Sequence, residues 1–399
     1  MSDDTQREEA VAVAREIMIE FAKATGLRPA TGSPRRYLWT DAFAVCNFLG
    51  LYEEYHEESF MHLALQLVDQ VHNVLGRFRQ DDERSGWLSG LGEQEGALHP
   101  TVGGLRIGKQ LRERKPDEPP DERLEWDRDG QYYHYLTKWM HALDRVTCVT
   151  GDFRYNRWAI ELAKRAQAGF VYTPFADGEK RMYWKMSTDL SHALVPSMGL
   201  HDPLDGLITF TQLDVTAGLG PAPAKTDLES EITDLAAMCQ GRNWVSDDPL
   251  GIGGLLADAF RIGQLMTKGA FAGTDLLLNL LRASILGLES FASEDTLRMP
   301  AKHRLAFREL GLSIGLKAAD RLSGLVRAKT RTFGEQHDVR NLVEALKNYE
   351  RLGELIDGFW LDPEHRNVRS WTDHRDINMV MLATSLAPQG YVTLYADPS

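Results

Sequence analysis

Apolar side chains recur at helical spacing on both sides of a polar break between residues 131 and 168. The stripes before and after the break each repeat every three or four residues, as in amphipathic helices. The apolar positions are Leu136, Trp139, Met140, Leu143, Val146, Trp158, Ala159, Leu162, Ala163 and Ala166. Gly151 and Asp152 separate the stripes, and a glycine just past the last periodic residue is typical of a helix end. We therefore predict a helical hairpin that turns at 151–152.

Further stretches carry turn signals, near residues 53–58, 199–203, 247–250, 292–294 and 360–365. Asp-Pro-Leu stands in two of them, and a proline in the first turn of a helix loses no hydrogen bond. Turn centres at 151, 202, 248 and 293 are 51, 46 and 45 residues apart, which suits pairs of ordinary helices. The chain thus predicts an all-α fold of roughly six hairpins. That number favours a closed ring, because a ring buries the faces of its terminal hairpins.

The run from Leu143 to Ala163 resembles the hairpin consensus of the six-hairpin glycosidase superfamily. These (α/α)6 toroids include many glycoside hydrolases, unsaturated-uronyl hydrolases and N-acyl-glucosamine epimerases. The resemblance covers most of residues 37–386 and is architectural, so it implies no catalytic role residue by residue. It implies one (α/α)6 toroid domain over residues 1–399, with a loop-rich insertion at about 80–125. It also implies a site in a funnel lined by loops and the N-terminal ends of the inner helices.

The formal net charge of −13 at pH 7 argues against two classes of partner. Nucleic acids and anionic membrane surfaces attract basic proteins, so we expect neither as a partner. The chain has no apolar run of about 18 residues, and its first residues are acidic, unlike those of a signal peptide. We therefore expect a cytoplasmic protein. Histidine clusters with metal-ligand spacing are missing, so we expect no metal and no cofactor. A homo-oligomer is compatible with the sequence.

Four clusters of aromatic and charged residues precede predicted helices, at 37–41, 126–134, 183–192 and 369–378. Aromatic rings stack on the apolar faces of pyranoses, and paired carboxylates supply acid and base for glycosidic cleavage. The predicted catalytic residues are Asp41, Asp127, Asp129, Asp189 and Asp373, with His192 as an alternative acid or base. The predicted stacking residues are Trp39, Tyr133, Trp184 and Trp371. Further predicted sugar contacts are His99, Arg106 and Lys109 in the insertion, and His374.

Three functions stay open at this point. The first is a glycoside hydrolase that acts on a small or oligomeric sugar through paired carboxylates. The second is a non-catalytic toroid that binds a sugar or a protein, in which the aspartates merely cap helices. The third is a sugar epimerase or isomerase, which requires convergent histidines, most plausibly His99, His192 and His374. For the tryptophans the alternative is a place in the core, and for the insertion it is a solvated hinge.

Overall fold

The computed structural model of the chain describes residues 3–30, 34–115, 117–174, 178–220, 227–272, 274–333 and 337–395. The chain divides into two compact units. Unit 1 comprises Met1–Phe21, Gly50–Glu57 and Arg242–Ser399, and unit 2 comprises Ala22–Leu49 and Glu58–Gly241. The single toroid domain over residues 1–399 stays a prediction.

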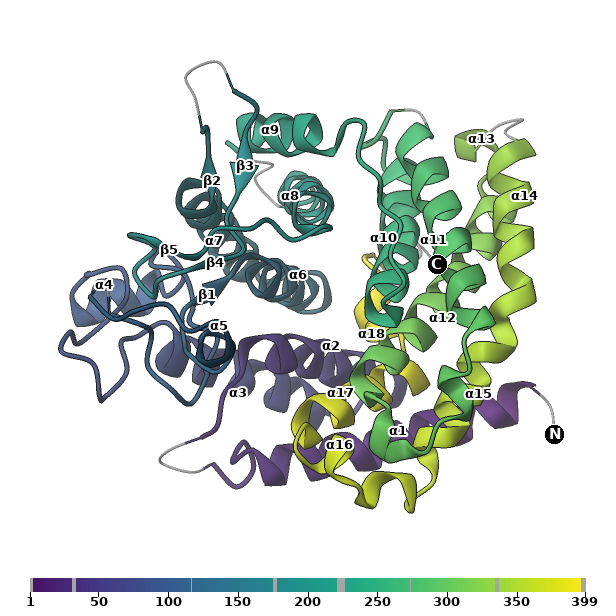
Figure 1. The fold of residues 1–399 in the computed structure, drawn as a ribbon, viewed down its shortest axis with the longest axis horizontal. Helices are drawn as coiled ribbons and strands as arrows, with labels where there is room; N and C mark the ends of the chain where they lie inside the picture. The colour runs from purple at the N-terminus through teal and green to yellow at the C-terminus, as the bar shows by residue number, and fades with distance from the viewer. Residues whose placement is uncertain are drawn as a thin grey trace. The chain divides into compact units, whose positions relative to one another are not determined.

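In its described residues, unit 2 contains most of one long helix, several further helices and five very short strands (Figure 1). In chain order they are α2 (Leu38–Tyr55, which continues into unit 1), α3 (Glu58–Leu75), α4 (Glu93–Leu98), α5 (Glu122–Glu125), β1 (Gln131–Tyr132), α6 (Tyr133–Thr150), α7 (Arg154–Phe170), β2 (Val171–Tyr172), β3 (Arg181–Met182), β4 (Lys185–Met186), β5 (Ala193–Val195), α8 (Asp202–Gly218) and α9 (Glu229–Cys239). The strands form an antiparallel sheet in the order β1-β4-β5 and an antiparallel β2–β3 pair.

Unit 1 is built from helices in its described residues. They are α1 (Asp3–Ala24, whose last turn lies in unit 2), α10 (Pro249–Thr267), α11 (Asp275–Ser293), η1 (Thr296–Arg298), η2 (Ala301–His303), α12 (Ala306–Ala328), α13 (Thr330–Phe333), α14 (His337–Leu346), η3 (Lys347–Tyr349), α15 (Glu350–Leu361), η4 (His365–Asn367), α16 (Arg369–Thr372), α17 (Arg375–Leu386) and α18 (Gln389–Val392). The prediction of an all-α fold is confirmed.

Helices α6 and α8 of unit 2 run parallel to each other. Side-chain contacts between them keep the same order along both helices, from Lys138 with Asp205 to Asp144 with Thr216. Helix α7 follows α6 after a sharp turn at Gly151, whose left-handed backbone (φ 71°) suits glycine. Because α7 runs antiparallel to α6, the chain returns to the side where α6 began. The next helix, α8, can then run in the same direction as α6. This is the topology that a segment of an α/α ring requires.

Unit 1 repeats the arrangement with α10, α12 and α17. The Phe307 amide donates to Asn378 Oδ1 at 2.9 Å, and Lys317 bonds the Ser385 carbonyl ten residues later, so α12 and α17 are parallel. Helices α10 and α12 approach closely at glycines, since a Cβ added at Gly253 would meet the Gly311 carbonyl oxygen at 2.0 Å. Each unit thus contains an arc of parallel helices, and closure into a six-hairpin ring stays a prediction.

The predicted phase of the hairpins is wrong after residue 171. Residues 199–203 and 247–250 precede α8 and α10, the first helices of their hairpins, rather than joining two helices of one hairpin. Likewise, 292–294 ends α11 and leads into the connection to α12. Pro203 and Pro249 do lie in first turns. A proline in a first turn marks where a helix begins but not which helix of a hairpin it is. The short strands between 171 and 195 stand where a helix was expected, and they change which of the later helices pair into hairpins.

Among the described helices, α11 is long and apolar enough to cross a membrane by length and composition. Its leucines Leu277, Leu280 and Leu281 are fully buried, and its C-terminal half packs on α10, where Gly287 lies against Ile252. A core helix gives the same pattern as a membrane span. The apolarity of α11 is therefore accounted for by packing within unit 1.

Candidate active site

An aromatic cluster, which consists of Tyr37, Tyr132, His134, Tyr135 and Trp184, lies at the N-terminal end of α6 in unit 2. Tyr135 is at its centre, with ring centroids 5.6 Å from Tyr37, 5.2 Å from Tyr132 and 4.8 Å from His134. The Tyr37 and Tyr135 hydroxyls form a hydrogen bond of 2.7 Å. The Trp184 ring lies 6.5 Å from His134. Three separate segments therefore place rings at one helix start.

Backbone pairing explains why these segments meet. Strand β1 pairs with β4, with Tyr132 opposite Lys185, which brings the neighbouring Trp184 to the start of α6. The Leu38 amide donates to the Ile107 carbonyl at 3.0 Å, and the Ile107 amide donates to Gly130 at 2.8 Å, so the starts of α2 and α6 share one extended segment. Outside this cluster Trp126 is half exposed and packs edge-on against Trp184 at 5.2 Å. Part of the aromatic surface therefore reaches solvent.

Because α8 runs parallel to α6, the first turns of the two helices lie side by side. Polar side chains of α8 therefore face the cluster. Asp202 Oδ1 lies 3.7 Å from His134 Nδ1, and one turn further Lys138 Nζ donates to Asp205 Oδ1 at 2.8 Å. Both aspartates are nearly buried. On the α2 side, Lys109 Nζ lies 5.4 Å from the centre of the Tyr37 ring. The cluster therefore combines stacking surfaces with a histidine, an ion pair and a cation.

Burial lowers the pKa of His134 to about 4, although the charge of Asp205 acts in the opposite direction. The imidazole is thus neutral at pH 7, and its remaining lone pair accepts a proton. Nδ1 is buried 3.7 Å from Asp202 Oδ1 and forms no hydrogen bond among the described residues, and the charge of Asp205 favours the imidazolium that forms on protonation. The arrangement equips His134 as a general base.

Two predicted catalytic carboxylates are engaged in structural contacts. Asp41 accepts from the Tyr37 amide at 2.9 Å and from Arg36 at 3.2 Å at the start of α2. Asp129 is fully buried and pairs with Arg106, while its other oxygen accepts from the Gly108 amide at 2.9 Å. Further donors to Asp129 are the Lys109 and Gly130 amides. These contacts serve as a cap and as a link between the insertion and β1.

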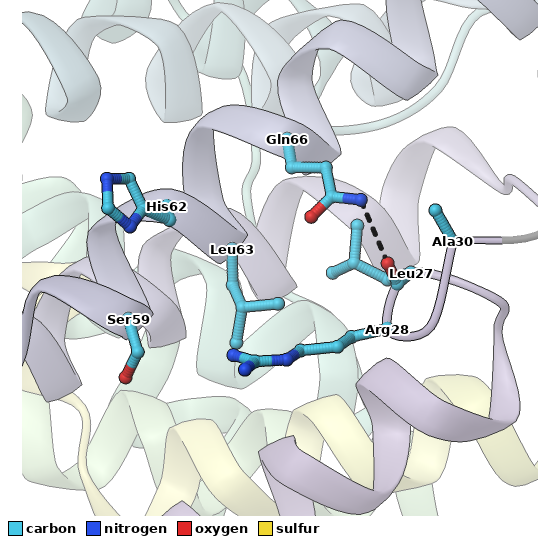
Figure 2. A pocket seen from close by; sticks show the side chains of 7 residues that line it. All are labelled: Leu27, Arg28, Ala30, Ser59, His62, Leu63 and Gln66. Carbon is cyan, nitrogen blue, oxygen red and sulfur yellow. Dashed lines mark hydrogen bonds between the residues drawn. The ribbon is translucent and has the colours of Figure 1, made fainter.

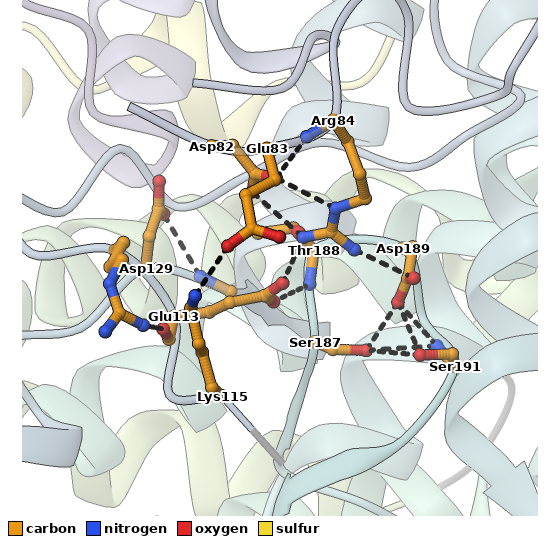
Figure 3. Close-up of polar contacts among 12 residues, drawn as sticks. Asp82, Glu83, Arg84, Glu113, Lys115, Asp129, Ser187, Thr188, Asp189 and Ser191 are labelled. Carbon is orange, nitrogen blue, oxygen red and sulfur yellow. Dashed lines mark hydrogen bonds and ion pairs between the residues drawn. The ribbon is translucent and has the colours of Figure 1, made fainter. Parts of the chain in front are cut away.

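Asp189 belongs to a polar network with Arg84, Ser187 and Ser191 (Figure 3). Although burial raises its pKa, hydrogen bonds from Ser191 and Ser187 and the charge of Arg84 lower it to about 2. Asp189 is thus ionised at pH 7 and has no proton to donate. Arg84 also bonds Asp82 and Glu113, and it therefore ties the insertion to the turn between β4 and β5. The prediction that 183–192 opens a helix is wrong, because this segment forms β4 and the turn that leads to β5.

The other predicted residues of unit 2 occupy varied places. Asp127 is exposed, and no carboxylate contact of it is found among the described residues. The His192 ring bonds Ser191 through Nδ1 at 3.1 Å, and its Nε2 has no hydrogen-bond partner within the described part of unit 2. His99 pairs with Glu161 at 2.7 Å. Trp39 is buried beside Phe43 and 6.5 Å from Tyr135, while Arg106 is buried and donates to the Arg77 and Val74 carbonyls. Lys109 is the insertion residue that contacts the aromatic cluster.

Tyr133, the first residue of α6, is fully buried 5.5 Å from Phe170 of α7, with its hydroxyl against Gly206 of α8, whereas its neighbours Tyr132, His134 and Tyr135 form the cluster. Tyr133, and not His134, was among the site residues predicted from the sequence. A helical wheel distinguishes Tyr133 from His134. Tyr133 lies three residues before Leu136 and seven before Met140, and therefore on the buried apolar stripe. His134 and Lys138, four residues apart, share the other face.

Three predicted residues lie in unit 1. Asp373 and His374 are exposed at the start of α17, and the His374 ring lies 5.7 Å from Phe307. Trp371 is buried and stacks on Trp360 at 5.6 Å, which indicates a core position within unit 1. In the described residues of both units, no group of three metal-ligating side chains converges.

A second buried acid, Asp144, lies in the core of unit 2 and accepts from Asn156 at 3.1 Å, Gln212 at 2.6 Å and Thr216 at 3.1 Å. Burial raises its pKa from 3.8 to about 6, against the effect of these hydrogen bonds. Because the folded state binds this proton more tightly than the unfolded chain does, Asp144 favours folding most below pH 4. That contribution is lost as the pH rises to 6, a loss of about 3 kcal/mol.

We expect the Asp144→Asn variant to lack this pH dependence. The measurement is the free energy of unfolding of wild type and variant between pH 4 and pH 7. Their difference is expected to move by about 3 kcal/mol in favour of the variant over that range, because asparagine does not ionise. A constant offset between the two proteins at every pH would contradict the raised pKa.

No protein-family model matches the chain, and no curated protein sequence matches it. Solved structures do match. One is a sugar epimerase from a ruminal bacterium, with 10% identity, 79% of this chain and 76% of that chain covered, and a TM-score of 0.43. Another is the cellobiose 2-epimerase from Bacillus thermoamylovorans, with 10% identity, the same coverage and a TM-score of 0.40.

A third match is the cellobiose 2-epimerase from Spirochaeta thermophila, with 10% identity, 86% of this chain and 98% of that chain covered, and a TM-score of 0.44. Structural similarity at 10% identity and these TM-scores does not indicate the activity of this chain. The activity has to be inferred from the geometry of the chain's own residues.

Proposed function

We propose that this protein is a carbohydrate-active enzyme that binds a small sugar at the aromatic cluster and transfers a proton through His134. The cluster supports sugar binding because aromatic faces stack on the apolar faces of pyranose rings. Lys138, Asp205 and Lys109 are polar side chains within or beside the cluster that suit sugar hydroxyls. This combination of platform and hydrogen-bonding groups is typical of a sugar site.

The observation that carries the reaction type is the neutral His134 at the centre of the polar groups of α8, with Asp202 Oδ1 3.7 Å from its Nδ1 and the Lys138–Asp205 ion pair one turn further. In an epimerisation or isomerisation, the base removes the proton from the carbon beside the carbonyl of the open-chain sugar. The C–H electron pair then forms an enediolate. In isomerisation His134 returns the proton to the neighbouring carbon, whereas in epimerisation an acid on the opposite face of the enediolate protonates the same carbon and His134 keeps the proton that it removed. His134 takes the proton on the ring nitrogen that does not face Asp202. Burial raises the pKa of the Tyr135 hydroxyl well above its usual value, so this group stays protonated and can donate a hydrogen bond to the developing oxyanion.

Hydrolysis is the second candidate, and the carboxylates support it less well. A glycosidase needs one carboxyl that is protonated near neutrality and a second that is ionised. Hydrogen bonds hold the pKa of Asp189 at about 2, and Asp41 and Asp129 accept several donors each. Proton transfer at carbon therefore makes better use of the groups that surround the cluster.

Incubation in D₂O separates the three functions. The purified protein is mixed with neutral, amino and uronic-acid sugars, both reducing sugars and glycosides, and followed by ¹H NMR. We expect a new sugar that carries deuterium at the carbon beside the carbonyl. Release of a reducing end without deuterium at that carbon would favour the hydrolase. Absence of binding and turnover across the panel would overturn the proposal in favour of a scaffold.

We expect Trp184→Ala to weaken sugar binding by roughly tenfold, because it removes one stacking surface. The main chain keeps its place, since the Trp184 amide donates to the Val195 carbonyl at 3.2 Å. The measurement is KM and kcat for the sugar found in the screen, with Trp184→Phe as the control that retains a ring. A large fall in kcat with unchanged KM would instead place Trp184 away from the bound sugar.

A further inference from the structure

A cavity of about 350 Å³ lies in unit 2 between the residues that follow α1 and the first turns of α3 (Figure 2). Its lining residues are Leu27, Arg28, Ala30, Ser59, His62, Leu63 and Gln66. A volume of this size is at the lower end of the range for small-molecule sites. Ala30, which is exposed, and the edge of the largely buried Leu63 give the cavity its apolar lining, and Leu27 is fully buried beneath them. Nothing in the aromatic cluster contributes to its lining.

The wall of the cavity is held in place by hydrogen bonds. The Leu27 and Arg28 amides both donate to the Ala22 carbonyl at 2.9 Å. From α3, Gln66 Nε2 donates to the Leu27 carbonyl at 3.0 Å, as Figure 2 shows. The segment that carries Arg28 is therefore fixed to two helices before any ligand binds, which lowers the entropic cost of binding.

Arg28 gives the cavity its charge. In the part of the chain that the structure describes, no carboxylate forms an ion pair with Arg28, although the protein carries 58 acidic residues. Figure 2 shows its guanidinium directed along the cavity toward the end lined by Ser59 and His62. A guanidinium, a hydroxyl and an imidazole are all groups that bind carboxylate or phosphate oxygens.

The cavity lies far from the aromatic cluster along α3. Ser59 is in the first turn of α3, and the other end of that helix meets the segment that positions the cluster, since the Arg106 amide donates to the Leu75 carbonyl at 2.9 Å. Nine residues of helix separate Gln66, the lining residue nearest to that end, from Leu75, a rise of about 14 Å, and Ser59 and His62 lie further away. A ligand in the cavity therefore does not occupy the sugar site.

We infer that this cavity binds a small organic anion, with its charged head on Arg28 and its apolar part on Ala30 and Leu63. The reverse orientation would place the charge against these apolar side chains and is excluded by its desolvation cost. The binding does not depend on the proposed sugar chemistry, because the two sites share no residue.

The test uses isothermal titration of the full chain with phenyl phosphate, inorganic phosphate and phenol. Phenyl phosphate combines a charged head with an apolar ring, and the other two probes each supply one half. We expect saturable binding of phenyl phosphate and at least tenfold weaker binding of each half. Arg28→Gln is expected to weaken phenyl phosphate binding by roughly tenfold or more, since a charge-assisted hydrogen bond is lost.

Arg35→Gln is the matched control. Arg35 follows Arg28 in the chain but donates to the Ala24 carbonyl at 3.0 Å and does not line the cavity. Its substitution, like Trp184→Ala in the aromatic cluster, is expected to leave phenyl phosphate binding unchanged. Absence of saturable binding, equal binding by Arg28→Gln with its fold intact by circular dichroism, or loss of binding in Trp184→Ala would each overturn the inference.

Discussion

Replacing His134 by glutamine is expected to lower kcat for the sugar substrate by roughly 10²- to 10⁴-fold, the usual contribution of a general base. Glutamine keeps a polar side chain of similar reach toward Asp202 but has no group that accepts a proton at neutral pH. Because substrate stacking on Tyr135 and Trp184 is unaffected, KM is expected to change little. The measurement is the rate of deuterium incorporation into the substrate by NMR.

The pH dependence of the wild type provides a second readout. With a pKa of about 4, His134 stays neutral from pH 6 to pH 8, and it contributes no change in rate over that interval. Below pH 5 the ring gains a proton and the rate is expected to fall. If the variant merely failed to fold, both deuterium exchange and sugar binding would be lost. Loss of exchange with sugar binding intact therefore assigns the effect to the reaction.

His99→Gln is the matched control for the histidine. His99 is half-buried on the insertion and pairs with Glu161 at 2.7 Å. We expect its substitution to leave kcat within about twofold, because surface changes of this kind have small effects. If His134→Gln retained kcat within tenfold while His99→Gln or His192→Gln lost it, the base would be one of the histidines predicted from the sequence.

The α6–α7 hairpin was predictable because local signals determine it. Leu136, Met140 and Leu143 form an apolar stripe, and Gly151 takes the left-handed backbone that ends the helix. These signals act within a few residues of each other. The phase of the later hairpins was not predictable in the same way. Pro203 begins a helix equally well whether that helix opens or closes a hairpin.

The site was harder to predict than the fold because its residues meet through long-range pairing. Tyr37, Tyr135 and Trp184 come from segments about a hundred and fifty residues apart at most, and their meeting depends on the β1–β4 register and on the extended segment at Ile107. Asp129 shows the same limit. Its sequence neighbours suggested catalysis, whereas its buried contacts come from Arg106 and Gly108, more than 20 residues earlier.

We expect Asp129→Ala to lower the free energy of unfolding by about 3–5 kcal/mol, the usual cost of leaving a buried charge without its partner. The Arg106 guanidinium is buried and keeps its bonds to the Arg77 and Val74 carbonyls, so it cannot reach solvent without breaking them. The Gly108 amide loses its acceptor as well. Chemical denaturation monitored by tryptophan fluorescence measures the change.

Asp127→Ala is the control, two residues away on the same segment. Asp127 is exposed, so its removal is expected to change the free energy of unfolding by less than about 0.5 kcal/mol. The pair also separates a structural from a catalytic role. If Asp129→Ala were as stable as Asp127→Ala yet inactive, the Asp129 carboxylate would serve the reaction rather than hold Arg106, and the insertion would owe its position to the Arg84 network instead.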